Sequence, residues 1–401
     1  MNFSSNIADL RPSATIAVST LAKKLRAEGR DIIDLSAGEP DFPTPGWICD
    51  AAVEGIRAGR TRYTPAPGIP ELRSAVVGSM LRGGRGEGWA LSPDQVVVTC
   101  GAKQALYNAC TALFGPGDEV MVATPYWTSY PQIVSLARAK SAFVSGPAEN
   151  GFKLTPEILE AERTEATRGL ILCSPSNPVG SVYSLEELRA VARWARDHEV
   201  HLISDEIYRR IYFGDPGESA PGLLDLDVDD VGSYVVVDGV SKAYAMTGWR
   251  IGFALAPVEI AGKLSALQSH STSNAATPSQ VAALRALDDG DRSDAEIGSM
   301  VEAFRRRRDL VLSRFAERLS DLDMIAPEGA FYLFIRVDGD YGGDIRDSQG
   351  WCSSVLESVG VALVPGAAFG DDRYVRLSYA TSDDLLEEAI RRVQTHRAGS
   401  A

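Results

Sequence analysis

Short hydrophobic runs, rich in valine and isoleucine, recur along residues 96–255 and are separated by segments with helical periodicity. Because these runs are continuously apolar and do not alternate with polar residues, we expect strands that are buried on both faces. Strands that alternate with helices form crossover units, so the pattern predicts an α/β fold with a mainly parallel sheet. The expected strands are VVVT (96–99), EVMVA (119–123), SAFV (141–144), GLILC (169–173), VHLIS (200–204), YVVVD (234–238) and IGFAL (251–255).

The last third of the chain has a different pattern. A long helix-like segment covers about residues 292–318, and shorter elements of mixed type follow it. We expect strands near 323–326, 331–336 and 374–379, and helices near 347–359 and 382–396. This mixture predicts a second, smaller α+β unit. We place the first 45 residues with it, which gives a large domain over 46–290 and a small domain formed by 1–45 together with 291–401.

Length and charge limit the partners that the chain can have. Its 401 residues are enough for two or three domains with a sizeable hydrophobic core. The formal net charge of −14 is unfavourable for binding nucleic acid or an anionic membrane, so we expect neither as a partner. A basic run, RRRR (305–308), lies inside the long predicted helix, and we interpret it as a solvated helix face.

Cysteine usage and the amino-terminal sequence bear on location. The five cysteines are an odd number without a C-x-x-C pair, so we expect buried free thiols in a reducing compartment. MNFSSNIADLRPSAT (1–15) has no apolar signal core, and no apolar run approaches the roughly 18 residues of a membrane span. We therefore expect a cytoplasmic protein. We expect no metal site, because the second histidine of HEVH (198–201) comes one residue early for H-E-x-x-H.

Chemically distinct residues follow five of the predicted strands. Ligands of an open parallel sheet bind at the carboxyl ends of its strands. These ends carry an aromatic ring, an amide, a carboxylate, an amine and the start of a helix, whose backbone N–H groups can bind an anion. Together they predict a binding site at one edge of the sheet. The segments are CGAK (100–103), TPYW (124–127), SPSNP (174–178), DEIY (205–208) and GVSK (239–242).

This set of segments closely resembles the class I and II pyridoxal-phosphate-dependent aminotransferases of fold type I, in particular the bacterial aspartate aminotransferase-like enzymes. The resemblance covers nearly the whole chain, and the order and separation of its motifs make it specific. It implies a mainly parallel seven-stranded sheet with helices on both faces, plus a smaller α+β domain. Its further motifs are SAGEPDFPTP (36–45), RYTPAPGIPELR (62–73), GAKQALYN (101–108), GVSKAYAMTGWRIG (239–252), GAFY (329–332) and VRLSYA (375–380).

The resemblance implies an enzyme that uses pyridoxal 5'-phosphate to move an amino group between an L-amino acid and a 2-oxo acid. By the matching motif, the amine of Lys242 condenses with the cofactor aldehyde and later moves the proton at the substrate Cα. Arg250 and Ser241 hold the cofactor phosphate, for which a forked cation and a hydroxyl are suited. Helix-start amides for the same phosphate belong to Gly101, Ala102 and Lys103.

The same resemblance assigns the residues around the cofactor ring. Asp205 faces the pyridine nitrogen and keeps it protonated, so that the ring can accept electrons. Tyr208 and Asn177 bind the ring oxygen, and Trp127 stacks on the ring. Tyr63 reaches a phosphate in the neighbouring subunit, which implies a homodimer with shared active sites.

Substrate binding is also assigned by resemblance. Arg376 matches the arginine that clamps the α-carboxylate, to which Gly38 offers a backbone amide. Lys103 and Thr15 match positions that contact the distal carboxylate in one bacterial branch, which favours aspartate, glutamate or prephenate-like acids. Glutamate and 2-oxoglutarate are the expected donor and acceptor. The implied substrate-binding set is Gly38, Arg376, Asn177, Trp127, Thr15 and Lys103.

Taken singly, these residues also have ordinary structural explanations. Asp205 could cap a helix, Asn177 could form a turn before proline, and Trp127 could belong to the core. Lys103 could simply start its helix. One departure from the family pattern is visible, because the usual N-P-T-G is N-P-V-G at 177–180, which removes a supporting hydroxyl.

Other functions remain open at this point. A pyridoxal-phosphate-dependent lyase, decarboxylase or oxidase would use the same cofactor-binding residues. The non-enzyme alternative is a ligand-sensing aminotransferase-like domain, although only about thirty residues precede IIDLSAGEP. A serine hydrolase is less consistent, since GVSKA (239–243) lacks the last glycine of G-x-S-x-G. Glycine-rich GGRGEG (83–88) precedes its strand, whereas a dinucleotide-binding loop follows one, so we interpret it as a plain connection.

Overall fold

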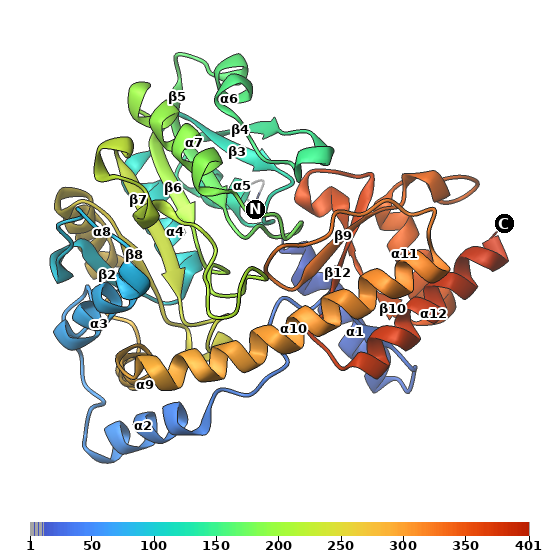
Figure 1. Ribbon diagram of the computed structural model, residues 1–401, viewed down its shortest axis with the longest axis horizontal. Helices are drawn as coiled ribbons and strands as arrows, with labels where there is room; N and C mark the ends of the chain where they lie inside the picture. Colours follow the sequence, from blue (N-terminus) through green and yellow to red (C-terminus); the bar gives the residue numbers. More distant parts are fainter. Residues whose placement is uncertain (1–3, 5–6, 8–9, 11, 401) are drawn as a thin grey trace.

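A seven-stranded sheet forms the centre of the computed structural model, which describes residues 4, 7, 10 and 12–400 (Figure 1). Its strands coincide with the predicted apolar runs. All neighbouring strands are parallel except β8, which is antiparallel to β2 and β7, so the prediction of a mainly parallel sheet is confirmed. The spatial order is β2 (Val96–Thr99), β8 (Gly252–Leu255), β7 (Tyr234–Gly239), β6 (His201–Asp205), β5 (Thr167–Cys173), β3 (Glu119–Thr124) and β4 (Lys140–Ser145).

Successive residues of six of these strands pack into two hydrophobic cores, one on each face of the sheet, whereas in the edge strand β4 only Val144 is buried and Phe143 is exposed, so the expected burial on both faces is wrong for β4. Val96 and Val98 belong to one core and Val97 to the other, as the alternation of side chains along a strand requires. This burial on both sides explains why the runs are continuously apolar. The helices are α2 (Gly46–Arg57), α3 (Pro70–Met80), α6 (Pro156–Glu162), α7 (Leu185–Asp197) and α9 (Thr277–Asp288) on the first core, and α4 (Ala102–Leu113), α5 (Tyr130–Leu136) and α8 (Val258–Ser271) on the second.

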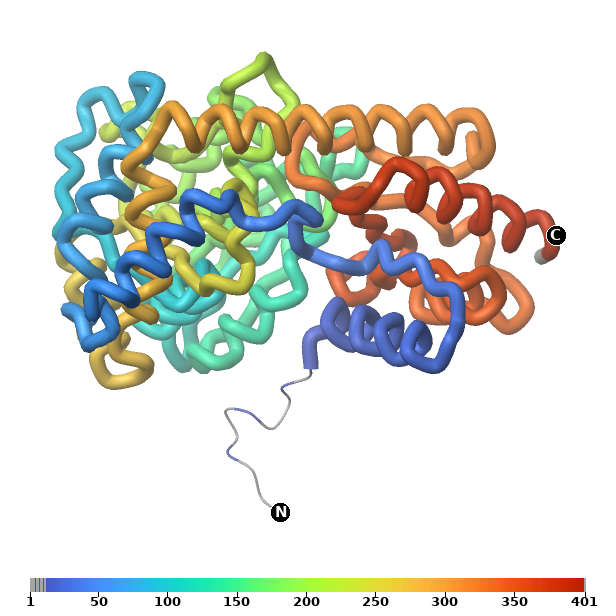
Figure 2. The backbone as a smooth tube through the Cα atoms, turned by 90° about the horizontal axis from the view of Figure 1, so that it is seen from below, coloured from blue at the N-terminus to red at the C-terminus, as the bar shows by residue number. Residues whose placement is uncertain are grey.

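The carboxyl-terminal unit, from α10 to α12, is a smaller α+β structure beside the sheet (Figure 1). It contains the antiparallel strands β9, β12 and β11. Helix α10 runs from the sheet into this unit, and α1 lies next to the unit (Figure 2). The elements are α1 (Ala14–Ala27), β1 (Ile33–Asp34), α10 (Gly290–Arg318), β9 (Tyr332–Arg336), α11 (Ser348–Val359), β10 (Val361–Ala362), β11 (Val364–Pro365), β12 (Tyr374–Ser378) and α12 (Asp383–Ser400).

Strand β1 joins the amino-terminal segment to this unit. It pairs in parallel with β10, with Ile33 opposite Val361. The two residues also share one hydrophobic core. Of the expected small domain, residues 1–3, 5–6, 8–9, 11 and 401 lie outside the described residues. The described part of the first 45 residues therefore contacts the carboxyl-terminal unit.

Two sequence-based expectations for this unit are wrong. No strand forms over 323–326, where only Met324 makes an isolated bridge, with Ile335. The RRRR run is not a solvated face, because Arg307 is 7% exposed and its guanidinium donates to both carboxylate oxygens of Asp41, at 2.7 and 2.8 Å. Arg305 donates to backbone carbonyl groups. The run therefore ties α10 to neighbouring segments, which helical periodicity alone does not reveal.

The cysteine prediction is partly wrong. All five cysteines are unpaired, but only Cys110 and Cys352 are buried, and Cys100 is exposed at the end of β2. Among the described residues, no group of three or more histidine, cysteine or acidic side chains could hold a metal ion. The helices of the described chain include none that is long and apolar enough to cross a membrane.

Candidate active site

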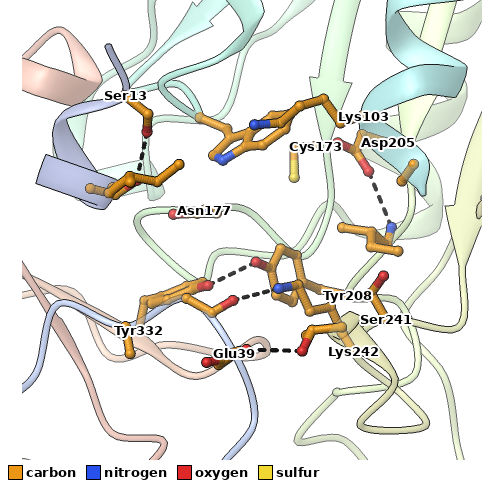
Figure 3. A pocket seen from close by; sticks show the side chains of 18 of the residues that line it. Ser13, Glu39, Lys103, Cys173, Asn177, Asp205, Tyr208, Ser241, Lys242 and Tyr332 are labelled. Atoms are coloured by element: carbon orange, nitrogen blue, oxygen red, sulfur yellow. Dashed lines mark hydrogen bonds between the residues drawn. The ribbon is translucent and has the colours of Figure 1, made fainter. Parts of the chain in front are cut away.

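Most of the residues expected at the site meet in one cavity of about 360 Å³ at the carboxyl ends of the strands (Figure 3). Its walls come from α1, the 36–39 segment, α4, the ends of β5 and β6, the turn after β7, and β12. The expected residues that line it are Thr15, Gly38, Ala102, Lys103, Trp127, Asn177, Asp205, Tyr208, Ser241, Lys242, Arg250 and Arg376.

Two expected residues do not line the cavity. Gly101 lies immediately outside it, at the start of α4, with φ of 80°. Tyr63 is 93% exposed and does not line the cavity of its own chain.

Lys242 follows β7 in a short turn, and its amine points into the cavity (Figure 3). Its Nζ donates to the carbonyl oxygen of Gly38 and lies 5.8 Å from the centre of the Tyr208 ring. Burial lowers the pKa of Lys242 to about 8, while the carboxylate of Glu39 opposes this shift. A substantial share of the amine is thus neutral near physiological pH, which is the form that attacks a carbonyl carbon.

Arg250 brings a second cation to the start of α4. It adopts the left-handed conformation (φ 57°), and its guanidinium donates to the carbonyl groups of Thr247 at 3.1 Å and Cys100 at 3.3 Å. A Cβ atom at Gly101 would overlap this guanidinium, so the close approach requires glycine. The arginine and the helix amides together form an end of the cavity that suits an anion such as phosphate.

Asp205 ends β6 and is 3% exposed. Its Oδ2 accepts a hydrogen bond from Tyr130 at 2.7 Å, and its Oδ1 accepts one from the backbone N–H of Ile207 at 3.3 Å. Burial raises the pKa of Asp205 to about 6, and these two hydrogen bonds oppose the shift. Asp205 is therefore a buried carboxylate that a cationic group in the cavity would stabilise.

Tyr208 lines the cavity, and its hydroxyl is paired with that of another tyrosine. Its hydroxyl is 2.8 Å from that of Tyr332, and both rings are buried. Burial raises the pKa of Tyr208 well above its ordinary value, so that the phenol stays protonated. Tyr208 can therefore serve as a neutral hydrogen-bond donor toward an oxygen atom in the cavity.

Arg376, on β12, is 1% exposed and is held by uncharged groups. It donates to Asn177 Oδ1 at 3.0 Å and to the carbonyl oxygen of Ser36 at 2.7 Å. Its Nε is buried without a hydrogen-bond partner among the described residues. A buried guanidinium whose direct partners are neutral suits an anion from outside the chain.

Lys103, in the first turn of α4, lines another part of the cavity. Its Nζ lies 4.9 Å from the centre of the Trp127 ring. Burial, followed by the nearby charge of Arg250, lowers the pKa of Lys103. Thr15 of α1 lines the same cavity, with its hydroxyl 2.9 Å from that of Ser13.

Sequence reasoning missed several residues of this site. Tyr332 lies within the motif GAFY (329–332) but has no role in the resemblance-based assignment, and Tyr130, Glu39, Cys173 and Thr247 also line the cavity. Tyr130 comes three residues after Trp127, and a turn in which its N–H donates to the carbonyl oxygen of Trp127 at 3.0 Å brings the centres of the two rings within 5.4 Å of each other. Glu39 accepts a hydrogen bond from Thr247 at 2.9 Å, and nothing in the sequence indicates this pairing.

Comparison with known proteins agrees with this geometry. A family model for class I and II aminotransferases matches residues 30–393. The chain is 44% identical over 408 residues to an aspartate/prephenate aminotransferase of Cereibacter sphaeroides, covering 99% of this chain and 98% of that one. It is 40% identical to an aspartate aminotransferase of Geobacillus stearothermophilus, covering 98% of each.

Solved structures give the same result. The aspartate aminotransferase from Thermus thermophilus with maleate matches the chain with a TM-score of 0.91 and 39% sequence identity, over 99% of this chain and 100% of that one. The fold is therefore fold type I, as the resemblance implied. From the family model, the relatives and the fold together, the chain belongs to the class I and II aminotransferase family and is an amino-acid aminotransferase.

Proposed function

We propose that this aminotransferase binds pyridoxal 5'-phosphate in the cavity and attaches it covalently through Lys242. Members of the family are pyridoxal-phosphate enzymes. The observation that carries the proposal is the partly buried amine of Lys242, whose pKa is about 8, in one cavity with Asp205 and Arg250. The amine can condense with the aldehyde of this cofactor, the carboxylate can bind its ring nitrogen, and the guanidinium can bind its phosphate.

The residues present fit each part of the cofactor. Arg250, Ser241 and the amides at the start of α4 provide donors for the phosphate, and Gly101 leaves space for the guanidinium. Asp205 is a buried carboxylate that lines the cavity, so it can accept a hydrogen bond from a protonated ring nitrogen. Trp127 lines the same cavity and offers an aromatic face to the ring.

Bound pyridoxal phosphate supplies an aldehyde and an electron-withdrawing ring, and the chain supplies positioning and proton transfer. We propose that the freed amine of Lys242 removes the proton from the substrate Cα and returns it at the cofactor carbon. Asp205 holds the positive charge on the ring nitrogen. Tyr208 donates to the ring oxygen, as does the Nδ2 of Asn177, because the Oδ1 of Asn177 already accepts from Arg376.

The substrate that we propose is an amino acid with a second carboxylate, such as aspartate, glutamate or a prephenate-derived acid. Arg376 would clamp the α-carboxylate in a bidentate pair, with the backbone amide of Gly38 beside it. Lys103 and Thr15 would face the distal carboxylate. Relatives named for aspartate and prephenate, and a matching structure with maleate, which is a dicarboxylate, support this choice. We propose 2-oxoglutarate as the amino acceptor.

We also propose that the chain forms a homodimer in which Tyr63 reaches the cofactor phosphate of the other subunit. The 93% exposure of Tyr63 supports the proposal, because an exposed aromatic ring is available to a second copy. The test mixes Tyr63→Ala and Lys242→Ala chains, each of which should have little activity alone. Mixed dimers should regain one intact site and measurable activity if the sites are shared. Activity that stays absent in proven mixed dimers contradicts the sharing.

We also propose a division into two domains and a cytoplasmic location. The domains would be 46–290 as the large domain, and 1–45 with 291–401 as the small one, with the cavity between them. Pairing of β1 with β10 supports this division. Five unpaired cysteines support the proposed cytoplasmic location.

Two spectroscopic steps test the proposed function. Purified protein incubated with pyridoxal phosphate should develop a visible absorbance band, which the Lys242→Ala variant lacks and the exposed-surface control Lys263→Ala retains. Addition of aspartate alone should remove the band and release one equivalent of oxaloacetate, and 2-oxoglutarate should restore it. Protein that takes up no cofactor contradicts the proposal. A cofactor-loaded protein that releases ammonia or carbon dioxide instead would favour a lyase or a decarboxylase.

A further inference from the structure

A buried group of charged residues lies directly behind Asp205. The next residue, Glu206, is 2% exposed and does not line the cavity. Its Oε1 accepts hydrogen bonds from the backbone N–H of Leu223 at 2.9 Å and from the hydroxyl of Ser204 at 3.2 Å. Two adjacent carboxylates are thus buried at the end of β6, one on the cavity side and one within the protein. Such a pair requires positive charge nearby.

The cation that reaches Glu206 comes from the glycine-rich stretch GGRGEG (83–88). The Nη2 of Arg85 lies 3.5 Å from Oε2 of Glu206, and its Nε donates to Asp225 at 2.7 Å. Gly86 fixes the path of this loop, because its φ is 70° and its N–H donates to the carbonyl oxygen of Leu224 at 2.8 Å. The interpretation of this stretch as a plain connection is therefore wrong: it inserts a buried charge behind the cavity.

Several other charged groups surround the two carboxylates. Arg209 lies 3.8 Å from Glu206, and burial followed by the charge of Arg85 lowers the pKa of Arg209 to about 10. Asp238, near the end of β7, is half-buried, and desolvation raises its pKa to about 7 against the opposing effect of Arg209. The remaining titratable groups that act on Asp205 face it from the cavity side and are Tyr130, Cys173 and Lys242.

The charge of Glu206 acts directly on Asp205. Its repulsion disfavours a second negative charge on the neighbouring carboxylate and so raises the pKa of Asp205. The positive charge of Arg85 acts in the opposite direction, because it stands beside Glu206 in a region with little water. The ion pair therefore decides how much negative charge is present behind the cavity.

We propose that Arg85 is a positioning residue for the reaction: by offsetting the negative charge of its neighbour Glu206, it sets the charge balance behind Asp205 and thereby the protonation of the bound cofactor. The inference rests on the proposed pyridoxal-phosphate function. It concerns a residue that does not touch the cavity, since neither Arg85 nor Glu206 lines it. The charge of Arg85 would act on the cofactor only through Asp205 and the field of the ion pair.

Neutralising Arg85 and Glu206, singly and together, tests the proposal with the cofactor-loaded protein. The measured quantity is the pH midpoint of the visible absorbance band. Arg85→Gln removes a positive charge and should raise the midpoint by about 0.5 pH unit, because a protonated cofactor is then favoured. Glu206→Gln should lower it by a similar amount. The double variant Arg85→Gln/Glu206→Gln should return close to the wild-type value, and Arg85→Lys should stay near it.

The control variant is Arg73→Gln. Arg73 also pairs with a carboxylate, that of Asp94, at 3.1 Å, and donates to the carbonyl group of Val96, but it does not contact Glu206. Its substitution should leave the midpoint unchanged. If Arg85→Gln does not fold, Glu206→Gln and the double variant carry the test.

The outcomes separate the two proposals. Folded Arg85→Gln and Glu206→Gln proteins with wild-type midpoints would overturn the role of Arg85. A double variant whose midpoint lies as far from the wild-type value as that of the more strongly shifted single variant would also overturn it. A loss of thermal stability without a shift in the midpoint would mean that Arg85 only anchors its loop. A wild-type protein without any visible band would overturn the proposed function, and this inference with it.

Discussion

The hydroxyl of Tyr130 donates a 2.7 Å hydrogen bond to Oδ2 of Asp205, and both side chains are buried. Burial raises the pKa of Asp205 to about 6, and this hydrogen bond holds the value down because it favours the ionised carboxylate. Without it, Asp205 would ionise only at higher pH. The contact therefore keeps the carboxylate charged where the cofactor nitrogen is expected.

The first prediction concerns Tyr130→Phe. Loss of the hydroxyl should move the acidic limb of the kcat profile to higher pH and lower kcat at pH 7 by about tenfold. The measurement is the steady-state rate from pH 5 to 9. Tyr107→Phe, on the adjacent helix α4, is the matched control and should leave the profile in place. An unchanged acidic limb in Tyr130→Phe would show that the hydrogen bond does not control the charge of Asp205.

The second prediction concerns Arg376→Lys. A single ammonium cannot hold both oxygens of a carboxylate while keeping the contacts of Arg376 with Asn177 and Ser36. The KM for the amino acid should therefore rise by about 100-fold. Arg373→Lys is the control, since Arg373 precedes the same strand and pairs with Asp371 outside the cavity. A KM that stays within twofold of the wild-type value in Arg376→Lys would exclude the proposed clamp.

The third prediction follows from the pKa of Lys242, which burial lowers to about 8 from an ordinary 10.5. Only the neutral amine attacks an aldehyde, so the reactive fraction grows with pH below this pKa and is nearly complete above it. The rate at which cofactor-free protein captures pyridoxal phosphate should therefore increase up to about pH 8 and then level off. Stopped-flow absorbance measures this rate.

The same experiment includes its own check. The carboxylate of Glu39 raises the pKa of Lys242, so Glu39→Gln should move the levelling point to lower pH. A capture rate that keeps rising toward pH 10 in the wild-type protein would mean that Lys242 is an ordinary solvated amine.

The fourth prediction concerns substrate choice. In Lys103→Met, the cation beside Trp127 is lost, so kcat/KM for aspartate should fall by about 100-fold while that for alanine changes little. Lys140→Met, on the exposed edge strand β4, is the control. Equal losses for aspartate and alanine would refute a role for Lys103 in recognising the distal carboxylate.

The sequence predicts the sheet well for a physical reason. Strands that are buried on both faces must be apolar throughout, and that constraint is visible within four to seven consecutive residues such as VVVT (96–99). The carboxyl ends of parallel strands meet at one edge, so residues such as Asp205 and Lys242 could be expected to lie together. Local patterns therefore suffice where the fold forces the residues to meet.

Contacts across long sequence separations could not be predicted in this way. Tyr130 and Asp205 are 75 residues apart, and Arg85 and Glu206 are 121 residues apart. Helical periodicity identifies the helix that contains Arg307, but its burial depends on Asp41, in a distant segment. Tertiary packing orients these side chains, and the residue pattern within a single helix or strand does not predict that orientation.

The central claim is that Lys242 carries the cofactor, and reductive trapping tests it most directly. Protein loaded with pyridoxal phosphate is treated with sodium borohydride, digested and analysed by mass spectrometry for the lysine that gains the cofactor mass. We predict that the modified residue is Lys242 and that Lys242→Ala protein retains no fixed cofactor. Modification of a different lysine, such as Lys103, or a wild-type protein without any modified lysine would contradict the account.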